Sequence, residues 1–523
     1  MPVPVTLTAK NSSQRLALNT VATYSRSLLG AGLALFSSRW VLNALGQVDY
    51  GLFSLVGSIL IFISFLNSVM SGSASRHYAY AIGQGDQIEV NRWFNAALSI
   101  HLCLAISLTF AGWFIGDYVI AHILNIPQER IFVCQQVFHI SLISLFTGML
   151  SVPFIAMFRA KQRIAELAGW NMMHSVLTFS FAWYLIHATG DRLVIYAFGM
   201  TAILFFVHSI QITRAALGFQ ECKLVLGQWF DPKRLKELFS FAAWNLIGNL
   251  GSILRDQGSA ILLNLYFGPK VNASYSIAKQ VSAQSGQLAV AMLGAFSPEI
   301  TAREGRGDRA SMINLSLRAS KIGTLLVLVF LIPLMTEMEY LLELWLVEPP
   351  RYTTVFCRLI LCTFLIDRLS AGYMLAVNAH GRIAGYQATI GTILVLTLPL
   401  TWLFFYMGCA PTSAGIAFII TMLFCSFGRV LWARHLLNVP IQRWIKKVVI
   451  PCCIVGFLAF IAAFLPKFFF PPSFGRLVLV TGSSVAVCSI ATWFVALDDK
   501  EQTFFHLNIF NLWNKLFKSQ HQE

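Results

Sequence analysis

Charged side chains occur inside long apolar segments of this sequence, where an ionised group needs a special environment. Arg26, Arg255 and Lys279 are three such cations, and Asp256 lies directly beside Arg255. An ion at the centre of a membrane helix costs about 2.5–3.5 kcal/mol on insertion scales, so such residues usually face a protein interior or water. A solvated cavity with excess positive charge attracts anions, and guanidinium groups suit phosphate especially well. These residues therefore predict an anion-binding cavity within the membrane.

Polar residues at helical spacing accompany these charges. Arg26 shares a helix face with Gly30 and Ser37, and Lys279 shares one with Tyr275. At 3.6 residues per turn, the side chain of Arg255 should project about 100° away from that of Asp256. Asp256 itself falls on a polar stripe of the seventh apolar segment, with the residues Asn245, Asn249, Ser252 and Ser259.

Alternative interpretations exist for several charged residues. The intramembrane charges could neutralise one another in pairs, as Asp367 and Arg368 would. Arg39, at the outer end of the first segment, could extend to the membrane surface or line the cavity. Four histidines in or at the ends of apolar segments are interpreted as interior residues rather than members of a proton relay; they are His101, His139, His174 and His187. An acidic outer segment is interpreted as a solvated helix end; its residues are Glu337, Glu339, Glu343 and Glu348.

The elements that position these residues are membrane helices. The 523 residues are 57% hydrophobic and only 12% charged, about half the usual charged fraction, which excludes a water-soluble enzyme. Segments of 18 or more mostly apolar residues recur along the chain, and each can span a bilayer as a helix. We expect about 14 spans, near residues 17–42, 51–72, 94–118, 131–157, 168–187, 193–213, 238–266, 272–297, 319–342, 353–378, 384–407, 412–433, 446–465 and 475–496.

The distribution of basic residues predicts the orientation in the membrane. With both termini in the cytoplasm, 24 lysines and arginines fall on the inner side and six in the outer loops. This bias follows the positive-inside rule and explains the net charge of +15 without a nucleic-acid partner. We therefore expect a multi-pass membrane protein with both termini in the cytoplasm and the bilayer as its surroundings.

A weak internal repeat suggests two related halves. Offsetting the chain by 222 residues aligns seven identical residues across two turns and two loops. Six spans separate the copies, so both have the same direction through the membrane, and the predicted symmetry axis lies along the membrane normal. The aligned pairs are Gly46 and Gly268, Ser54 and Ser276, Gly72 and Gly294, Ser75 and Ser297, Gly83 and Gly305, Gly85 and Gly307, and Asp86 and Asp308.

The repeat and the polar connections predict the organisation of the chain. Asp231, an N-cap residue, is followed by Pro232 at the first position of a helix. The predicted fold is all-α, with two parallel six-helix lobes and two additional C-terminal helices. The predicted parts are an N-terminal lobe over 1–217, a cytoplasmic linker with an interfacial helix over 218–237, a second lobe over 238–436, the two extra helices over 437–497, and an amphipathic cytoplasmic tail over 498–523.

Three sequence motifs resemble those of a known family. They are the segment from Arg26 to Gly30, the outer turn from Leu45 to Phe53, and the loop from Gly83 to Asp86. With the topology of the whole chain, they resemble the O-antigen (lipid-linked oligosaccharide) flippases of the MATE-like exporter superfamily. The resemblance implies two lobes around a central cavity, and translocation of an undecaprenyl-diphosphate-linked glycan to the outer leaflet by alternating access.

The resemblance and the charges together predict roles for individual residues. Arg26, Arg255 and Lys279 are expected to hold the diphosphate, and Asp256 or Asp367 to bind a coupling Na⁺ or H⁺. No other cofactor and no metal site are expected, and polysaccharide assembly enzymes are candidate partners. Residues expected to meet sugar hydroxyls or to contribute further to substrate binding are Tyr275, Asn245, Asn249 and Arg39.

Two other functions compete with the flippase. A cation-coupled small-molecule exporter of the same architecture should prefer an acidic cavity, which the positive excess argues against. A membrane-embedded glycan polymerase or ligase would be an enzyme and would usually need a large outer loop, whereas the outer loops predicted here are short. The sequence therefore favours a transporter over an enzyme.

Overall fold

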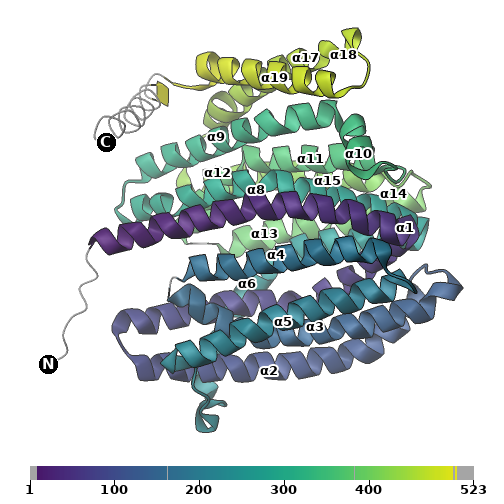
Figure 1. Ribbon diagram of the computed structural model, residues 1–523. Coiled ribbons are helices and arrows are strands. Elements are labelled where there is room, and N and C mark those ends of the chain that lie inside the picture. Colours follow the sequence, from purple (N-terminus) through teal and green to yellow (C-terminus); the bar gives the residue numbers. More distant parts are fainter. Residues whose placement is uncertain (1–8, 162, 382, 499–500, 503–523) are drawn as a thin grey trace, which may run out of the picture. The chain divides into compact units, whose positions relative to one another are not determined.

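The computed structural model describes the chain except for residues 1–8, 162, 382, 499–500 and 503–523 (Figure 1). The described backbone consists of helices and short connections, without a β-strand. A helix satisfies its backbone hydrogen bonds within its own segment, which the hydrocarbon core of a bilayer requires. The all-α fold predicted from the sequence is thus confirmed. Most of the predicted amphipathic tail lies outside the described residues.

Each predicted span falls on a helical segment. The element α1 (Ala9–Gln84) consists of two helices joined at Gly46, whose backbone is not helical, and contains the first two predicted spans. The next four are α2 (Gln87–Tyr118) with η1 (Val119–Ile123), α3 (Gln128–Ala160), α4 (Ile164–His187) and α5 (Arg192–Gly218). The seventh span consists of α6 (Pro232–Ile253), η4 (Leu254–Gly258) and α7 (Ser259–Phe267), and the eighth is α8 (Pro269–Gly305).

The later spans include several broken helices. A 45° bend separates α11 (Thr353–Leu369) from α12 (Ala371–His380). The remaining elements are α9 (Arg309–Thr336), α10 (Met338–Leu346), α13 (Ala384–Val395), α14 (Thr397–Tyr406), α15 (Ser413–Leu437), α16 (Ile441–Trp444), η5 (Ile445–Val449), α17 (Ile450–Phe464), α18 (Pro466–Phe469), α19 (Phe474–Ala491) and η6 (Thr492–Ala496).

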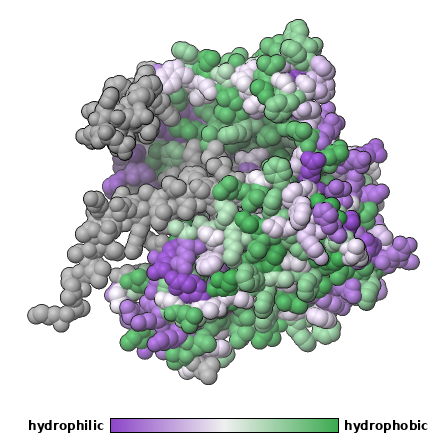
Figure 2. All heavy atoms as spheres, in the orientation of Figure 1, coloured by the Kyte–Doolittle hydropathy of each residue, from purple (hydrophilic) through white to green (hydrophobic). Residues whose placement is uncertain are grey.

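By length and composition alone, nine helices of the described chain can cross a membrane, and the bent pair α11–α12 makes a tenth. Within the part of the chain that the structure describes, α4, α6–η4–α7 and α8 are not among these helices. Hydrophobic side chains cover the middle of the helices, and hydrophilic ones gather toward helix ends (Figure 2).

The helices group into two compact units. The first contains Met1–Ile277, Trp345–Thr353 and Gly391–Ala414, and the second contains the rest of the chain. In the second unit, α9 packs closely on α12, because Gly372 allows the α12 backbone to approach that of Ser316. The boundaries of these two compact units differ from those of the two lobes predicted from the sequence. The lobes are defined by the internal repeat rather than by compactness, and their boundaries remain predictions.

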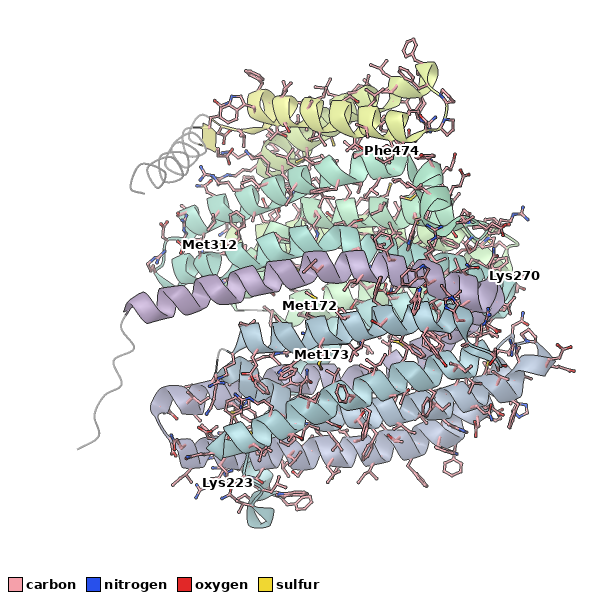
Figure 3. The ribbon with its side chains drawn as sticks, viewed as in Figure 1. Met172, Met173, Lys223, Lys270, Met312 and Phe474 are labelled. Carbon is pink, nitrogen blue, oxygen red and sulfur yellow. The ribbon has the colours of Figure 1, made fainter. Side chains whose placement is uncertain are left out.

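The two ends of each unit agree with the predicted topology. In the first unit, Lys223 of the predicted inner side and Lys270 of the predicted outer side lie at opposite ends of the helices (Figure 3). In the second unit, Met312 near the start of α9 and Phe474 at the start of α19 are likewise separated by the length of the helices (Figure 3). The sidedness of these ends rests on the positive-inside rule.

The predicted N-cap at Asp231 is confirmed. Its carboxylate accepts hydrogen bonds from the backbone N–H groups of Lys233 at 3.0 Å and Arg234 at 3.2 Å. The hydrogen bond from the Arg234 backbone lowers the pKa of Asp231 below its ordinary value, and the Arg234 guanidinium lowers it further. The helix that begins at Pro232 is not a separate interfacial helix, however: it continues without a break to Ile253.

The internal repeat appears in the backbone. Gly46 has φ 75° and ψ 171°, and its partner Gly268 has φ 79° and ψ −178°. Gly85 and Gly307 also match, with φ 76° and 78°. The aspartate after each of the latter glycines caps the following helix: Asp86 accepts from Glu89 N and Asp308 from Ser311 N. Glycine alone adopts positive φ at no steric cost, so both halves share the same two turns.

Candidate functional site

A single π-helical turn, η4, interrupts the seventh predicted span and carries the charged pair. Arg255 donates a hydrogen bond from Nε to Asp256 Oδ1 at 2.8 Å. The two side chains are 16% and 27% exposed, so both are largely withdrawn from the surface. A π-turn in a long helix often marks a functional site. In the described chain, η4 is therefore the first place to look for substrate chemistry.

Arg255 and Asp256 form an ion pair, although the sequence predicts that their side chains project about 100° apart. They are consecutive residues of the π-turn, which has more residues per turn than an α-helix. The long guanidinium can then bend back to its neighbour. As a result, the positive charge of Arg255 is balanced locally by Asp256, and any surplus of positive charge rests on the other cations.

Tyr275 of α8 holds the same turn from the neighbouring helix. Its side chain is 2% exposed, and its hydroxyl donates a hydrogen bond to the backbone carbonyl of Asp256 at 3.1 Å. A phenol that donates in this way still has lone pairs that can accept. The structure thus brings three predicted site residues together, namely Arg255, Asp256 and Tyr275.

The other predicted substrate-binding residues are distributed over α1, α6 and α8. Lys279 lies on α8, four residues after Tyr275, and is partly buried in the second compact unit. Arg39 is half-buried on α1, one turn after Leu35, whose carbonyl accepts a hydrogen bond from Trp345 Nε1 at 2.6 Å. Arg26 on α1 and Asn245 and Asn249 on α6 have side chains outside the described part of the structure, and their roles remain predictions.

A buried charge cluster surrounds Asp367 in the second unit. One carboxylate oxygen accepts from Arg429 at 2.8 Å, and the other pairs with Arg368. Arg429 also donates to Ser370 Oγ at 3.3 Å, and the Arg368 guanidinium lies 4.7 Å from the centre of the Phe364 ring. The pairing of Asp367 with Arg368 is the neutralising alternative that the sequence left open. A coupling cation at Asp367 would have to displace a guanidinium.

Sequence reasoning did not single out Arg429. It lies in a predicted span, is 7% exposed, and is 62 residues from Asp367. Its type and its position in an apolar segment were a usable signal, since an intramembrane arginine needs a partner. The sequence does not show which distant acidic residue is the partner of Arg429.

Another charge network ties the predicted outer ends of three helices together. Asp49, from the outer-turn motif, pairs with Arg130 at the start of α3. Arg130 also donates to Asp191 at 2.5 Å, and Asp191 caps α5 by accepting from Leu193 N at 3.0 Å. The aspartate of this motif therefore has a structural role in joining α1, α3 and α5.

The acidic segment near residue 337 is only partly as expected. Glu339, Glu343 and Glu348 are exposed, as a solvated helix end should be. Glu337 is buried and accepts from Arg476 Nη2 at 2.7 Å, which joins the end of α9 to the start of α19. The solvated interpretation is wrong for Glu337, because Arg476 provides the charge that burial requires.

Metal binding has no candidate in the described part of the chain, where no group of three histidine, cysteine, aspartate or glutamate side chains could hold an ion. The side chains gathered at η4 are those of an arginine, an aspartate and a tyrosine, which can hydrogen-bond to anions or hydroxyl groups. No protein-family model matches the sequence.

Comparison with solved structures defines the class of fold. An inward-facing multidrug resistance MATE family transporter of the MOP superfamily superimposes with a TM-score of 0.69 at 14% identity, covering 80% of this chain and 98% of that one. The lipid II flippase MurJ, in an inward closed conformation, gives 0.67 at 14% identity, covering 91% and 98%. The chain therefore has the membrane-protein fold that the MATE transporter and MurJ structures share; the proteins of those two structures are a transporter and a flippase.

One curated relative matches in sequence. It is the uncharacterized membrane protein EpsK of Bacillus subtilis (strain 168), which is 22% identical over 329 residues. The match covers 60% of this chain and 61% of EpsK, so the chain spans about three fifths of the length of that relative. A further solved structure, a MOP superfamily transporter from Pyrococcus furiosus described as having reversed binding-pocket polarity, has a TM-score of 0.53.

Proposed function

We propose that this protein is a flippase that translocates a polyprenyl-diphosphate-linked oligosaccharide, an O-antigen or exopolysaccharide repeat unit, across the bacterial inner membrane. The observation that carries the proposal is the structural match to a lipid II flippase over 91% of the chain, compared with 80% for the multidrug transporter. Both termini are then cytoplasmic, and enzymes of polysaccharide assembly supply and consume the lipid-linked substrate.

The physical requirements of that substrate agree with the residues of the site. A diphosphate and its sugars cannot cross hydrocarbon unaided, while the polyprenyl tail can remain in the lipid. In our proposal Arg26, Arg255 and Lys279 hold the diphosphate, because guanidinium and ammonium groups bind phosphate oxygens. The sugar hydroxyls meet the polar side chains nearby, which are Tyr275, Asn245, Asn249 and Arg39.

The Arg255–Asp256 pair suggests how substrate and coupling ion exchange. A guanidinium has five N–H donors, and the bond to Asp256 uses the one on Nε. A diphosphate that draws Arg255 toward itself weakens its pair with Asp256 and leaves a carboxylate able to take Na⁺ or H⁺. Release of the diphosphate lets Arg255 return and expel the cation. Substrate and cation then each bias the same two-state pair, which is the requirement for coupling.

A flux assay with lipid-linked glycan in reconstituted vesicles tests the proposal. We expect Arg26→Ala and Arg255→Ala to lower flux strongly at normal expression, because each removes a predicted phosphate ligand. The matched control is Arg214→Ala, which removes a surface arginine that pairs with Glu166 at 3.0 Å. Unchanged flux in both site variants would eliminate the anion-binding role and with it this proposal.

A cation-coupled small-molecule exporter is the second candidate, favoured by the slightly higher TM-score of the MATE transporter. It predicts efflux of small cations that depends on Asp256 or Asp367 and is indifferent to Arg26. Measuring dye efflux from cells that carry Asp256→Asn or Arg26→Ala separates the two functions. An exporter should lose efflux in Asp256→Asn and keep it in Arg26→Ala.

A further inference from the structure

A polar pocket of about 510 Å³ lies in the second compact unit, apart from η4. Its walls come from the end of α8, the first half of α9, η5 and the segment after η6. By the positive-inside rule these elements end on the inner face of the membrane. The charged side chains that line the pocket are Arg303, Arg318, Lys321, Lys447, Asp498 and Glu501.

The pocket has an excess of positive charge even after its ion pairs are considered. Glu501 serves two bases: it accepts from Lys321 Nζ at 2.6 Å and lies 3.2 Å from Arg318 Nε. Lys447 is 3.9 Å from Asp498, which is at the outer limit of an ion pair. Four lining bases therefore face two lining carboxylates.

Neighbouring charges do not reverse this balance. Arg303 donates from Nε to Glu299 at 2.9 Å, which adds one acid. Arg443 donates to the lining residue Asn314 at 2.7 Å, which adds one base. With both included, five bases stand against three acids. The pocket as a whole attracts an anion.

Two of the bases are placed where an external ligand can reach them. The Arg318 and Lys447 side chains are 43% and 49% exposed, whereas Lys321 and Glu501 are 5% and 4% exposed. The buried pair is further fixed by a 2.6 Å hydrogen bond from Lys321 to the carbonyl of Ala496. Lys321 and Glu501 thus form the buried base of the pocket, and Arg318 and Lys447 are the basic side chains that a bound molecule can contact.

Exposed apolar side chains lie within a few residues of two of the lining residues, Lys447 and Asp498. On α17, directly after Lys447, Ile450 and Ile454 are 46% and 41% exposed. On the last span, before Asp498, Ile490 and Phe494 are 59% and 77% exposed. Side chains of this kind on a membrane helix face lipid tails. A ligand with a phosphate at one end and acyl chains at the other matches both surfaces.

We propose that this pocket binds the phosphate headgroup of an anionic phospholipid of the inner leaflet, at a site separate from the transported substrate. Arg318 and Lys447 bind the phosphate oxygens, and the acyl chains lie along the exposed apolar residues of α17, α19 and η6. Basic residues at the surface of an anionic leaflet contribute attraction of this kind.

The test uses the full-length protein in phosphatidylcholine nanodiscs with increasing phosphatidylglycerol, measuring bound lipid by native mass spectrometry and the midpoint of thermal unfolding. We expect phosphatidylglycerol to be retained and to raise the midpoint. Lys447→Gln should weaken phosphatidylglycerol binding about fivefold, the factor for one basic residue near the surface. Lys447→Arg should restore it, and Arg318→Gln is a second, independent variant.

The matched control is Lys446→Gln, which removes an exposed neighbouring lysine that does not line the pocket. Equal losses in Lys446→Gln and Lys447→Gln would show a diffuse surface charge and overturn the proposal. So would an equal stabilisation by inorganic phosphate in phosphatidylcholine alone, which would indicate a water-soluble ligand. Retention of phosphatidylglycerol no better than phosphatidylcholine by the wild-type protein would also overturn it.

Discussion

Replacing Asp256 with asparagine should strengthen binding of a diphosphate if Asp256 and the substrate compete for Arg255. The Nε–Oδ1 distance of 2.8 Å corresponds to about 6 kcal/mol of attraction at an effective dielectric constant of about 20, before desolvation is subtracted. A hydrogen bond to a charged group contributes about 1.5–3 kcal/mol net. Asparagine keeps the shape of the side chain but not its charge. In the Asp256→Asn variant, Arg255 therefore gives up a weaker interaction when it binds the diphosphate, and binding becomes more favourable. We expect affinity for pyrophosphate to rise about tenfold, which is about 1.4 kcal/mol.

The assay is isothermal titration of pyrophosphate into the purified full-length protein in detergent. Arg255→Gln should bind pyrophosphate more weakly than the wild type, and Asp256→Asn more tightly. The control is Asp117→Asn, because Asp117 pairs with His139 at 3.0 Å rather than with an arginine; its affinity should equal that of the wild type. If Asp256→Asn weakened binding as much as Arg255→Gln does, Asp256 would position Arg255 for the ligand, and the exchange mechanism would be refuted.

Three further predictions concern stability, measured as thermal unfolding of the solubilised protein. Glu337→Gln breaks its buried ion pair and should cost about 3–5 kcal/mol, while the exposed Glu339→Gln should cost about 0–1 kcal/mol; equal effects would contradict the burial argument. Gly372→Ala places a Cβ 1.8 Å from the carbonyl oxygen of Ser316 and should cost about 1–3 kcal/mol by forcing α9 and α12 apart; an unchanged midpoint would show that this packing is not tight. Asp231→Ala removes a helix cap and should cost about 1 kcal/mol at neutral pH. Because the folded-state pKa of Asp231 is lowered, the cap stabilises above the usual carboxyl pKa and this contribution is lost as pH falls through the folded value, so the difference between variant and wild type should shrink in acid; a constant difference would contradict the charged cap.

The features predictable from the sequence are those encoded locally. Apolar runs located helical segments, and the Asp231–Pro232 pair located the start of α6, because hydropathy and capping depend on neighbouring residues. The repeat was also predictable, since a glycine at positive φ is specified at its own position. Gly46 and Gly268 show this most clearly.

The charge pairs of the interior were harder to predict. A regular helical wheel places the side chains of Arg255 and Asp256 about 100° apart, so the wheel alone does not predict that the two side chains pair. The pairs of Glu337 with Arg476 and of Lys321 with Glu501 join residues 139 and 180 positions apart, so no local pattern reveals them. A charged residue in an apolar segment indicates from the sequence that a partner is needed. Which residue is that partner depends on how distant helices pack, and the sequence does not show it.

The two halves of the chain have the same glycine turns, but their charged residues do not align with each other. At the offset that pairs Gly46 with Gly268, the counterparts of Arg255, Asp256 and Lys279 are Leu33, Ala34 and Gly57. Conversely, the counterparts of Arg26 and Arg39 from the first half are Gly248 and Ile261. The two halves therefore share the glycines at which they turn but carry their intramembrane charges at different positions, so a ligand would meet a different set of charged groups in each half.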